Sequence, residues 1–440
     1  MLLIYTPDIT ERIKYTFALF FNQLIRVNYL ITSSEEEFAQ YKGNKFSYAS
    51  ENIFGSALYF ISTSLLFETD ISEYHPSGIT GQIDGRELIG FFEVNESPMP
   101  FDVFASAFYL VSRYEEYVTG KHDHFGRYKD EHSIAQHCGF LGKPMVNYYA
   151  FAVKSILQKY FPDLKFEEPK FSVLNTVDVD MAWKYKHKGF YRNTSGFVRD
   201  LINRRFDLIK ERFEILVLRK NDPFHSFDYL IAQSKSQQIP LCFFWLLGSY
   251  AELDKNINRE NAHFKSLMKR VDAESDSGIH FSFKGHHQKK SFGDELASLE
   301  KILGRKVTKN RYHFLKFDIA KSLYKLINLG IKEEYSFGYS AHSGFRASIA
   351  SPFYWFDLTL NQQTDLLIRP LIFMDATIRY HKPMSDEKIM QYIDALLQKT
   401  HAVNGQFIAL WHNDIFDDSK NDWKMIFEWF NKRAAALIHS

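Results

Sequence analysis

The sequence predicts an α/β protein in two parts, a smaller mixed α/β domain over residues 1–165 and a larger domain over residues 170–440. From residue 170 on, short apolar strands alternate with amphipathic helices, which is typical of βα units around a parallel sheet or barrel. The polar segment 167–170 precedes this change of pattern and is the expected boundary. A chain of 440 residues also exceeds one ordinary core, so more than one domain is expected.

The N-terminal part is expected to combine short strands with amphipathic helices, without a constellation of catalytic residues. Strands are predicted at residues 2–5, 27–32 and 45–48, and helices at 10–24, 102–117 and 147–160. Residues 121–128 are predicted to form a polar loop. Its His122 and His124 are more simply explained as surface residues than as metal ligands, because no third ligand is near in sequence.

The C-terminal part is expected to contain six strands, each a short apolar run, at residues 172–175, 241–246, 278–281, 312–315, 367–374 and 406–410. Asp318 can cap a helix that Gly330 ends, and two more helices are predicted around 296–303 and from Ser385. Residues 185–225 are basic and without strand signals, so we expect an insertion of helical character after the first strand.

Two carboxylates follow the strand that begins at Phe171. It runs into Thr176, Asp178 and Asp180, and the spacing of two places both carboxylates on the same face of an extended chain. Carboxylates at the end of a buried strand are costly to desolvate unless a cation or a transferable proton lies between them. We therefore interpret this stretch as the start of a metal site with a general base beside it.

Polar side chains also follow the other predicted strands. In a βα barrel the strand ends meet on one face, so these residues are expected to lie together. A single histidine in such a position is more often structural, but a set on four or five separate strands favours a functional site. The set is His280, Arg311, His313, Asp375, Trp411 and His412.

Composition excludes several other classes. A net charge of +1 leaves no basic excess for a general nucleic-acid binder. The two cysteines, Cys138 and Cys242, provide neither a disulfide framework nor a cysteine metal site. The sequence shows no basic segment before an apolar run and no stretch of about 20 apolar residues, so we expect a cytoplasmic protein without stable membrane insertion. The sequence does not indicate an oligomeric state.

The order of the motifs, T-x-D-x-D after a strand, then G-x-H, R-x-H, G-F-R and L-W-H-N, resembles the polysaccharide deacetylase superfamily, carbohydrate esterase family 4 with its NodB homology domain. It is most similar to two-part bacterial members that have an N-terminal domain of unknown role. The resemblance implies a distorted (β/α) barrel over residues 170–440. It also implies a divalent metal, usually zinc, and removal of acetyl groups from an N- or O-acetylated saccharide.

The resemblance implies a role for each matched residue. Asp178 would be the base that activates water and Arg311 would orient it, while Asp375 would tune the catalytic His412. Asp180 and His280 would bind the metal. The family places a second histidine at position 284, which is Lys here, so His286 is the expected replacement, with His287, Ser282 or water as alternatives. The residues expected to contact the substrate are His313, Tyr339, Arg346 and Trp411.

Amide hydrolysis by a metal-bound water requires the same residue types. Hydrolysis of an amide at neutral pH needs an activated water, a base for its proton and an acid for the leaving amine. Three alternatives remain. A glycosyltransferase would use the Asp-x-Asp motif but would leave the histidines unexplained, and a serine hydrolase lacks the G-x-S-x-G spacing in residues 338–344. A homologue impaired by Lys284 would bind carbohydrate without hydrolysing it.

Overall fold

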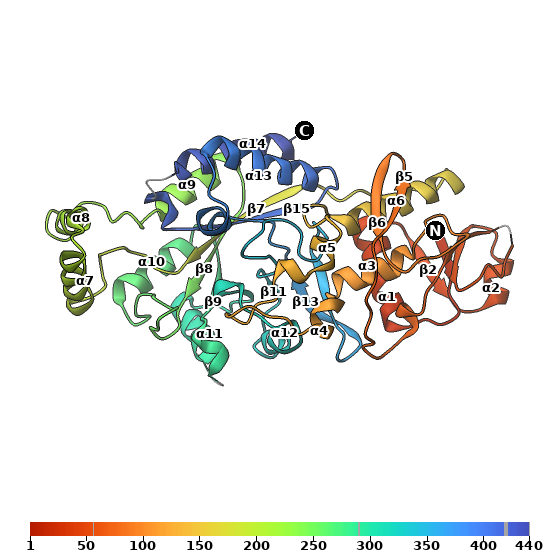
Figure 1. Ribbon diagram of the computed structural model, residues 1–440, viewed down its shortest axis with the longest axis horizontal. Helices are drawn as coiled ribbons and strands as arrows, with labels where there is room; N and C mark the ends of the chain where they lie inside the picture. The colour runs from red at the N-terminus through yellow and green to blue at the C-terminus, as the bar shows by residue number, and fades with distance from the viewer. Residues whose placement is uncertain (56, 289–290, 418–420, 440) are drawn as a thin grey trace.

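The computed structural model describes all residues except 56, 289–290, 418–420 and 440. It shows a mixed α/β chain with a four-stranded sheet in the N-terminal part and a nine-stranded sheet in the C-terminal part. The N-terminal part lies at one end of the elongated molecule and a helical hairpin at the other, with the large sheet between them (Figure 1).

The N-terminal sheet is parallel, with strand order β2-β1-β3-β4. Its strands are β1 (Leu2–Tyr5), β2 (Tyr29–Thr32), β3 (Asn44–Ala49) and β4 (Leu58–Ile61), and a hairpin of β5 (Ile79–Ile83) and β6 (Arg86–Gly90) follows. The helices are α1 (Glu11–Phe17), η1 (Ala18–Leu24), α2 (Glu35–Gln40), α3 (Val103–Val111), α4 (Tyr114–Val118), α5 (Ile134–His137) and α6 (Met145–Tyr160). The three predicted strands and three predicted helices are therefore present, but the hairpin was not predicted.

Helix α3 is the centre of this part, because all nine of its residues are buried. Asp102 caps it, accepting hydrogen bonds from the backbone N–H groups of Phe104 and Ala105. The helix expected to continue to residue 117 instead breaks at Arg113, which adopts a left-handed φ of 56°, and resumes as α4. After the break, Glu116 of α4 pairs with Arg346 of the C-terminal part, whereas Glu115 accepts from Arg113 and from the N–H of Ile134.

The large sheet has the order β12-β13-β11-β10-β9-β8-β7-β15-β14, and all neighbours are parallel except β12 and β13. Its strands are β7 (Ser172–Val179), β8 (Leu241–Leu246), β9 (Asp276–Phe281), β10 (Lys309–Tyr312), β11 (Glu333–Glu334), β12 (Phe353–Asp357), β13 (Gln362–Ile368), β14 (Phe373–Met374) and β15 (Gln406–His412). Every residue of β8 is buried, as expected for a parallel strand covered on both faces. Within the described residues no strand pairing joins β12 to β14, so the sheet is open in its hydrogen bonding.

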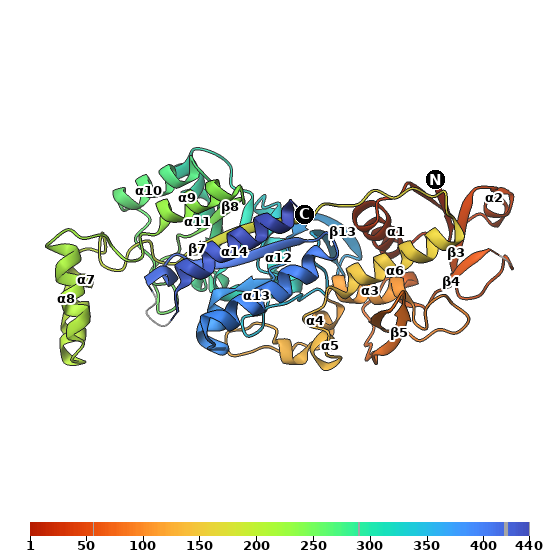
Figure 2. The same ribbon diagram turned by 90° about the horizontal axis from the view of Figure 1, so that it is seen from above.

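Helices lie against the outside of this sheet (Figures 1 and 2). They are α9 (Phe227–Gln237), α10 (Ala262–Asp272), α11 (Ser291–Leu303), α12 (Ile319–Asn328), α13 (Asp386–His401) and α14 (Trp423–Ile438). Asp318 caps α12 as predicted, accepting from the N–H groups of Ala320 and Lys321. The basic insertion forms α7 (Phe190–Ile202) and α8 (Phe206–Leu216). None of the described helices combines the length and the apolar character needed to cross a membrane.

Two strand predictions were wrong in their bounds. The strand predicted at 312–315 is β10, which ends at Tyr312, and His313–Leu315 form a 3-10 turn with Phe314 at a left-handed φ of 60°. The run predicted as one strand over 367–374 is divided between β13 and β14. Pro370 lies in the gap and has no N–H to donate to a ladder.

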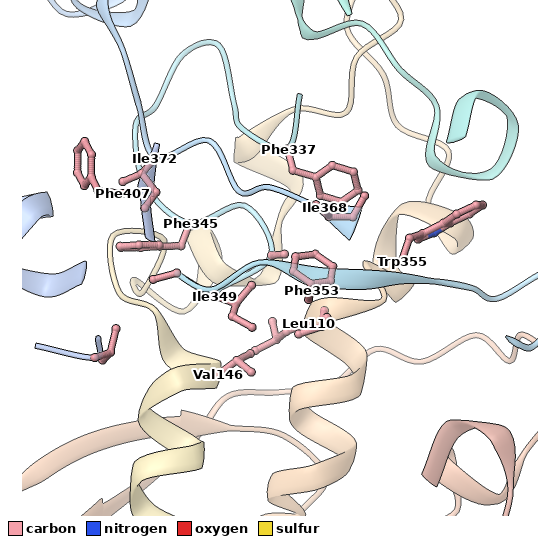
Figure 3. Close-up of a cluster of buried hydrophobic side chains, with 14 of the residues drawn as sticks. Leu110, Val146, Phe337, Phe345, Ile349, Phe353, Trp355, Ile368, Ile372 and Phe407 are labelled. Atoms are coloured by element: carbon pink, nitrogen blue, oxygen red, sulfur yellow. The ribbon is translucent and has the colours of Figure 1, made fainter. Parts of the chain in front are cut away.

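The N-terminal and C-terminal parts share one continuous hydrophobic core. Figure 3 shows Leu110 of α3 and Val146 of α6 against Ile349 and Phe353 of the C-terminal part. Close to this cluster, the ring of Phe108 packs on Phe356 with 5.0 Å between centroids. The position of the large sheet therefore depends on apolar contacts with both α3 and α6.

Candidate metal and catalytic site

Side chains from separate strands converge at the carboxyl ends of the large sheet. Arg311 on β10 donates to Asp178 on β7 over 2.9 Å, although β9 and β8 lie between these strands. Neighbouring strands are about 4.8 Å apart, so a flat sheet would separate β10 from β7 by about 14 Å. The sheet must therefore curl strongly, and its inner face encloses a cavity of about 480 Å³. The polar residues lining this cavity include Asp178, Asp180, His280, His313 and His412.

Asp180, His280 and His313 form a cluster whose possible ligand atoms all lie within 4.8 Å of one another. The Nε2 atom of His280 is 3.3 Å from Oδ1 of Asp180, and Nε2 of His313 is 3.5 Å from Oδ2. Both histidines are buried, whereas the Asp180 side chain is 39% exposed, so the cluster opens into the cavity.

Hydrogen bonds on the far side of each ring fix which nitrogen faces the cluster. Nδ1 of His280 lies 2.8 Å from the backbone carbonyl of Arg311, which can only accept, so Nδ1 carries the hydrogen. Nδ1 of His313 lies 2.8 Å from Oδ1 of Asp254, a fully buried carboxylate. In their neutral forms both imidazoles therefore present an Nε2 lone pair to Asp180, because the acceptor on the far side of each ring fixes the tautomer, as it does for histidines that bind a metal.

This donor set fits a divalent cation. Two nitrogen lone pairs and a carboxylate face the same small space, and Oδ1 of Asp180 is buried without a hydrogen-bond partner. Burial lowers the pKa of His313, but the carboxylates of Asp180 and Asp254 outweigh it and raise the pKa to about 9. Nitrogen and oxygen ligands of this kind suit zinc and similar ions.

Asp178 is held beside the cluster by the guanidinium of Arg311. Nη1 of Arg311 donates to Oδ1 of Asp178 and also to the hydroxyl of Thr176, over 2.8 Å. Nε donates to the carbonyl of Tyr335, so the fully buried guanidinium is fixed at two points. The second oxygen of Asp178, Oδ2, lies 3.5 Å from Nε2 of His280 and is free of the arginine. This oxygen is the one available to accept a proton.

His412 lies on β15 beside Asp178, its register partner on the neighbouring strand β7, and both line the cavity. Its Nδ1 is 2.7 Å from Oδ1 of Asp375, and its backbone N–H donates to Oδ2 of the same carboxylate. Burial lowers the pKa of His412, but Asp375 outweighs it and raises the pKa to about 10. The imidazole is therefore protonated at neutral pH, and its Nε2 is left for the cavity.

The N-terminal part supplies one wall of the cavity. The loop over residues 121–128, predicted to be a plain polar loop, places Phe125 and Arg127 among the lining residues. Arg127 is paired with Asp123 at 2.8 Å and donates to the carbonyl of Phe314. Arg379 and Tyr380 of the C-terminal part also line the cavity. His122 and His124 lie outside the cluster of possible metal ligands found among the described residues.

His286, the expected replacement for the family's second histidine, does not reach the cluster. Its ring packs between Tyr312 and Phe292, with centroids 4.9 and 5.1 Å away. Burial lowers the pKa of His286 to about 3, so it is a neutral core residue. The structure brings His313 to Asp180 and His280 instead, because the 3-10 turn after β10 directs its ring inward. Lys284 contributes its backbone N–H, which donates to Asp254 over 2.8 Å.

Tyr339 and Arg346, which were expected to contact the substrate, lie between the two parts of the chain. They line a second cavity, of about 310 Å³, that shares Arg127 and Ser340 with the first. Arg346 forms a two-pronged pair with Glu116 of α4, at 2.6 and 3.0 Å. Arg113 donates to Glu116 over 2.8 Å and to the Tyr339 hydroxyl over 3.0 Å. All of these side chains are nearly or fully buried, and neither Tyr339 nor Arg346 lines the cavity of the cluster.

Trp411 also lies away from the cavity. Alternation along β15 directs its ring to the helix-covered face, where it is fully buried against Phe373 and Phe427. Its Nε1–H donates to Asn175 over 2.9 Å. Asp254 was missed by the sequence analysis, because it lies in a loop between β8 and α10 without a motif around it.

A family of unknown function, DUF7033, matches residues 2–162. No curated protein matches the sequence. Among solved structures, one from Mycobacterium smegmatis described as that of a polysaccharide deacetylase is 12% identical, covers 61% of this chain and 85% of its own, and has a TM-score of 0.39.

Two further solved structures are similar to this chain. The polysaccharide deacetylase Bc1974 of Bacillus cereus is 13% identical, with 59% of this chain and 85% of its own covered and a TM-score of 0.30. A mutant of BA3943, described as a CE4 family pseudoenzyme with restored activity, is 13% identical, with 66% and 78% covered and a TM-score of 0.24. Likenesses this weak carry no argument, so function must be argued from the site itself.

Proposed function

We propose that the protein is a metal-dependent deacetylase that hydrolyses the acetyl amide or ester of a saccharide, on a curled, barrel-like C-terminal domain and in the cytoplasm. The observation that carries the proposal is the convergence of Asp180, His280 and His313 with a base, Asp178, and a protonated histidine, His412, on the same cavity. The order of the sequence motifs, which resembles carbohydrate esterase family 4, supports the saccharide as substrate.

Asp180, His280 and His313 would hold the cation, with zinc the first candidate. When bound, such a cation would acidify water and polarise the acetyl oxygen. Asp254 keeps the His313 ring oriented toward the site through Nδ1. In this assignment His313 replaces the histidine that the family pattern puts at position 284.

The remaining residues would move protons. Oδ2 of Asp178 would accept the proton of the attacking water, while Arg311 holds the carboxylate in place through Oδ1. Nε2–H of His412 would donate a proton to the leaving amine or alcohol as the bond to the acyl carbon breaks, and Asp375 keeps this histidine protonated. The products would be acetate and the deacetylated sugar.

The test is acetate release by the purified chain from N-acetylated and O-acetylated oligosaccharides. We expect release that stops with a chelator and returns with added zinc. Asp180→Asn should abolish both zinc binding and release, while Asp365→Asn, the same change at an exposed position on β13, should leave both unchanged. If zinc added to the folded wild-type protein neither binds nor supports release, the proposal fails.

The same experiment separates the enzyme from a homologue that only binds carbohydrate. The impaired homologue predicted from Lys284 would bind an acetylated saccharide without producing acetate. The position of His313 in the cluster favours the enzyme, because three possible ligands are present without a histidine at position 284.

A further inference from the structure

The hairpin of α7 and α8 extends away from the rest of the chain at the end opposite the N-terminal part, and both views show it without a neighbouring element along most of its length (Figures 1 and 2). About half of the large apolar side chains exposed in the described residues lie between Phe190 and Leu218. Tyr191 is 88% exposed, Ile202 74% and Phe206 63%. An exposed apolar patch of this kind marks a surface that binds another protein or a membrane.

The two helices of the hairpin meet largely through polar side chains, and most of their large apolar side chains are exposed. The two helices meet through Arg212, which pairs with the buried Asp200 at 2.6 Å and donates to Asn193 over 3.1 Å. Gly196 allows this approach, since a Cβ there would lie 2.8 Å from Nη2 of Arg212. The apolar side chains of α7 recur at the spacing of one helical face, which points to solvent. They are Phe190, Tyr191, Val198, Leu201 and Ile202.

The hairpin is also basic. Residues 190–220 contain eight Lys and Arg against four Asp and Glu, in a chain with a net charge of only +1. Two of the four acidic groups are neutralised within the hairpin, Asp200 by Arg212 and Glu214 by Lys220, and Lys184 pairs with a third, Glu211. The turn between the helices carries exposed Arg204 and Arg205 between the exposed Ile202 and Phe206.

We propose that this hairpin docks the protein on the surface of an anionic lipid bilayer, with its apolar face at the level of the headgroups. An amphipathic helix with aromatic and aliphatic residues on one face and Lys and Arg beside them binds in this way. Charge complementarity selects the bilayer over a second copy of the chain, since two copies would bring like-charged hairpins together. The hairpin does not contact the cavity, so docking is independent of the proposed function.

The test is sedimentation of the full chain with vesicles of phosphatidylcholine alone and with vesicles that also contain phosphatidylglycerol. We expect the wild type to bind the anionic vesicles and to be released by salt. Arg204→Gln with Arg205→Gln should weaken binding about 30-fold, because each cation near anionic lipid contributes about a factor of five. Ile202→Ser with Phe206→Ser should weaken it at least about tenfold for each side chain.

Tyr324→Ser with Leu360→Ser is the matched control, because these side chains are 48% and 50% exposed but lie outside the hairpin. This pair should bind as the wild type does. The proposal is overturned if the folded wild type does not sediment with anionic vesicles at low salt, or if the hairpin variants bind these vesicles as well as the control does. A concentration-dependent dimer that Ile202→Ser with Phe206→Ser disrupts, without vesicle binding, would assign the face to a second copy.

Discussion

Replacing Asp254 by Asn tests whether this buried carboxylate acts on the cluster through His313. Oδ1 of Asp254 accepts from Nδ1 of His313 and from the N–H of Phe283, and Oδ2 accepts from the N–H of Lys284, each over 2.8 Å. Asn removes the charge and turns one acceptor into an NH₂ group that faces an N–H donor. The variant should therefore lose both ligand orientation and a buried hydrogen bond.

The two losses have different magnitudes and different readouts. Removing an outer-shell partner of a metal-binding histidine lowers metal affinity about 10- to 100-fold, which corresponds to about 1.4–2.7 kcal/mol. The unsatisfied buried N–H should lower the free energy of unfolding by about 1–3 kcal/mol. Zinc affinity is measured by competition with a chelating indicator, and unfolding by urea titration of the metal-free protein.

Glu295→Gln is the control that separates these effects. Glu295 is as buried as Asp254 and holds the same loop, accepting from the N–H and hydroxyl of Ser282, but it does not touch His313. It should lower the unfolding free energy without lowering zinc affinity. If Asp254→Asn binds zinc as tightly as the wild type, or if Glu295→Gln weakens zinc equally, then Asp254 does not act through His313.

Three further predictions concern the base, the acid and the junction between the two parts. Asp178→Asn should abolish acetate release and keep zinc, while Asp180→Asn should lose zinc, and equal zinc retention by both would refute the assignment. The His412 pKa of about 10 lies above its unfolded value of 6.5, so protonated His412 stabilises the fold fully below about pH 6.5, and this stabilisation is lost as pH rises through about 10. The value of kcat/KM should decrease as the pH rises through about 10, where His412 loses its proton. Asp375→Asn should shift this decrease to lower pH, and an unshifted profile would exclude His412 as the acid. Glu116→Gln should lower the free energy of unfolding, measured by urea titration, by about 3–5 kcal/mol, because it leaves the buried Arg346 and Arg113 without their shared carboxylate. A decrease of less than about 1 kcal/mol would contradict this pairing.

Local sequence signals predicted the elements better than they predicted the site. The apolar run of β8 and the Asp318 cap of α12 needed only pattern and capping chemistry. The grouping of His313 with Asp180 depends on a turn in which Phe314 adopts a left-handed φ, which aromatic residues seldom do and which spacing alone does not reveal. Nearness in sequence was equally misleading for His286. It lies only six residues from His280, yet its ring packs against Phe292 and Tyr312 and not in the cluster.

Long-range contacts place further residues that spacing alone does not locate. Arg346 of the G-F-R segment pairs with Glu116, which lies 230 residues earlier in the chain. Pairings over such separations leave no local signal. The same holds for the loop over residues 121–128, whose Phe125 and Arg127 line a cavity built mostly from the other part of the chain.

The first 165 residues pack against the large sheet and form part of the wall of the cavity. A chain truncated to residues 170–440 would expose the Phe356 ring that Phe108 and Tyr15 cover, and it would leave Arg346 without Glu116. It would also lack the part of the cavity wall that Phe125 and Arg127 form. The cavity beside His313 would then open to bulk water where the intact protein has an aromatic ring and a guanidinium.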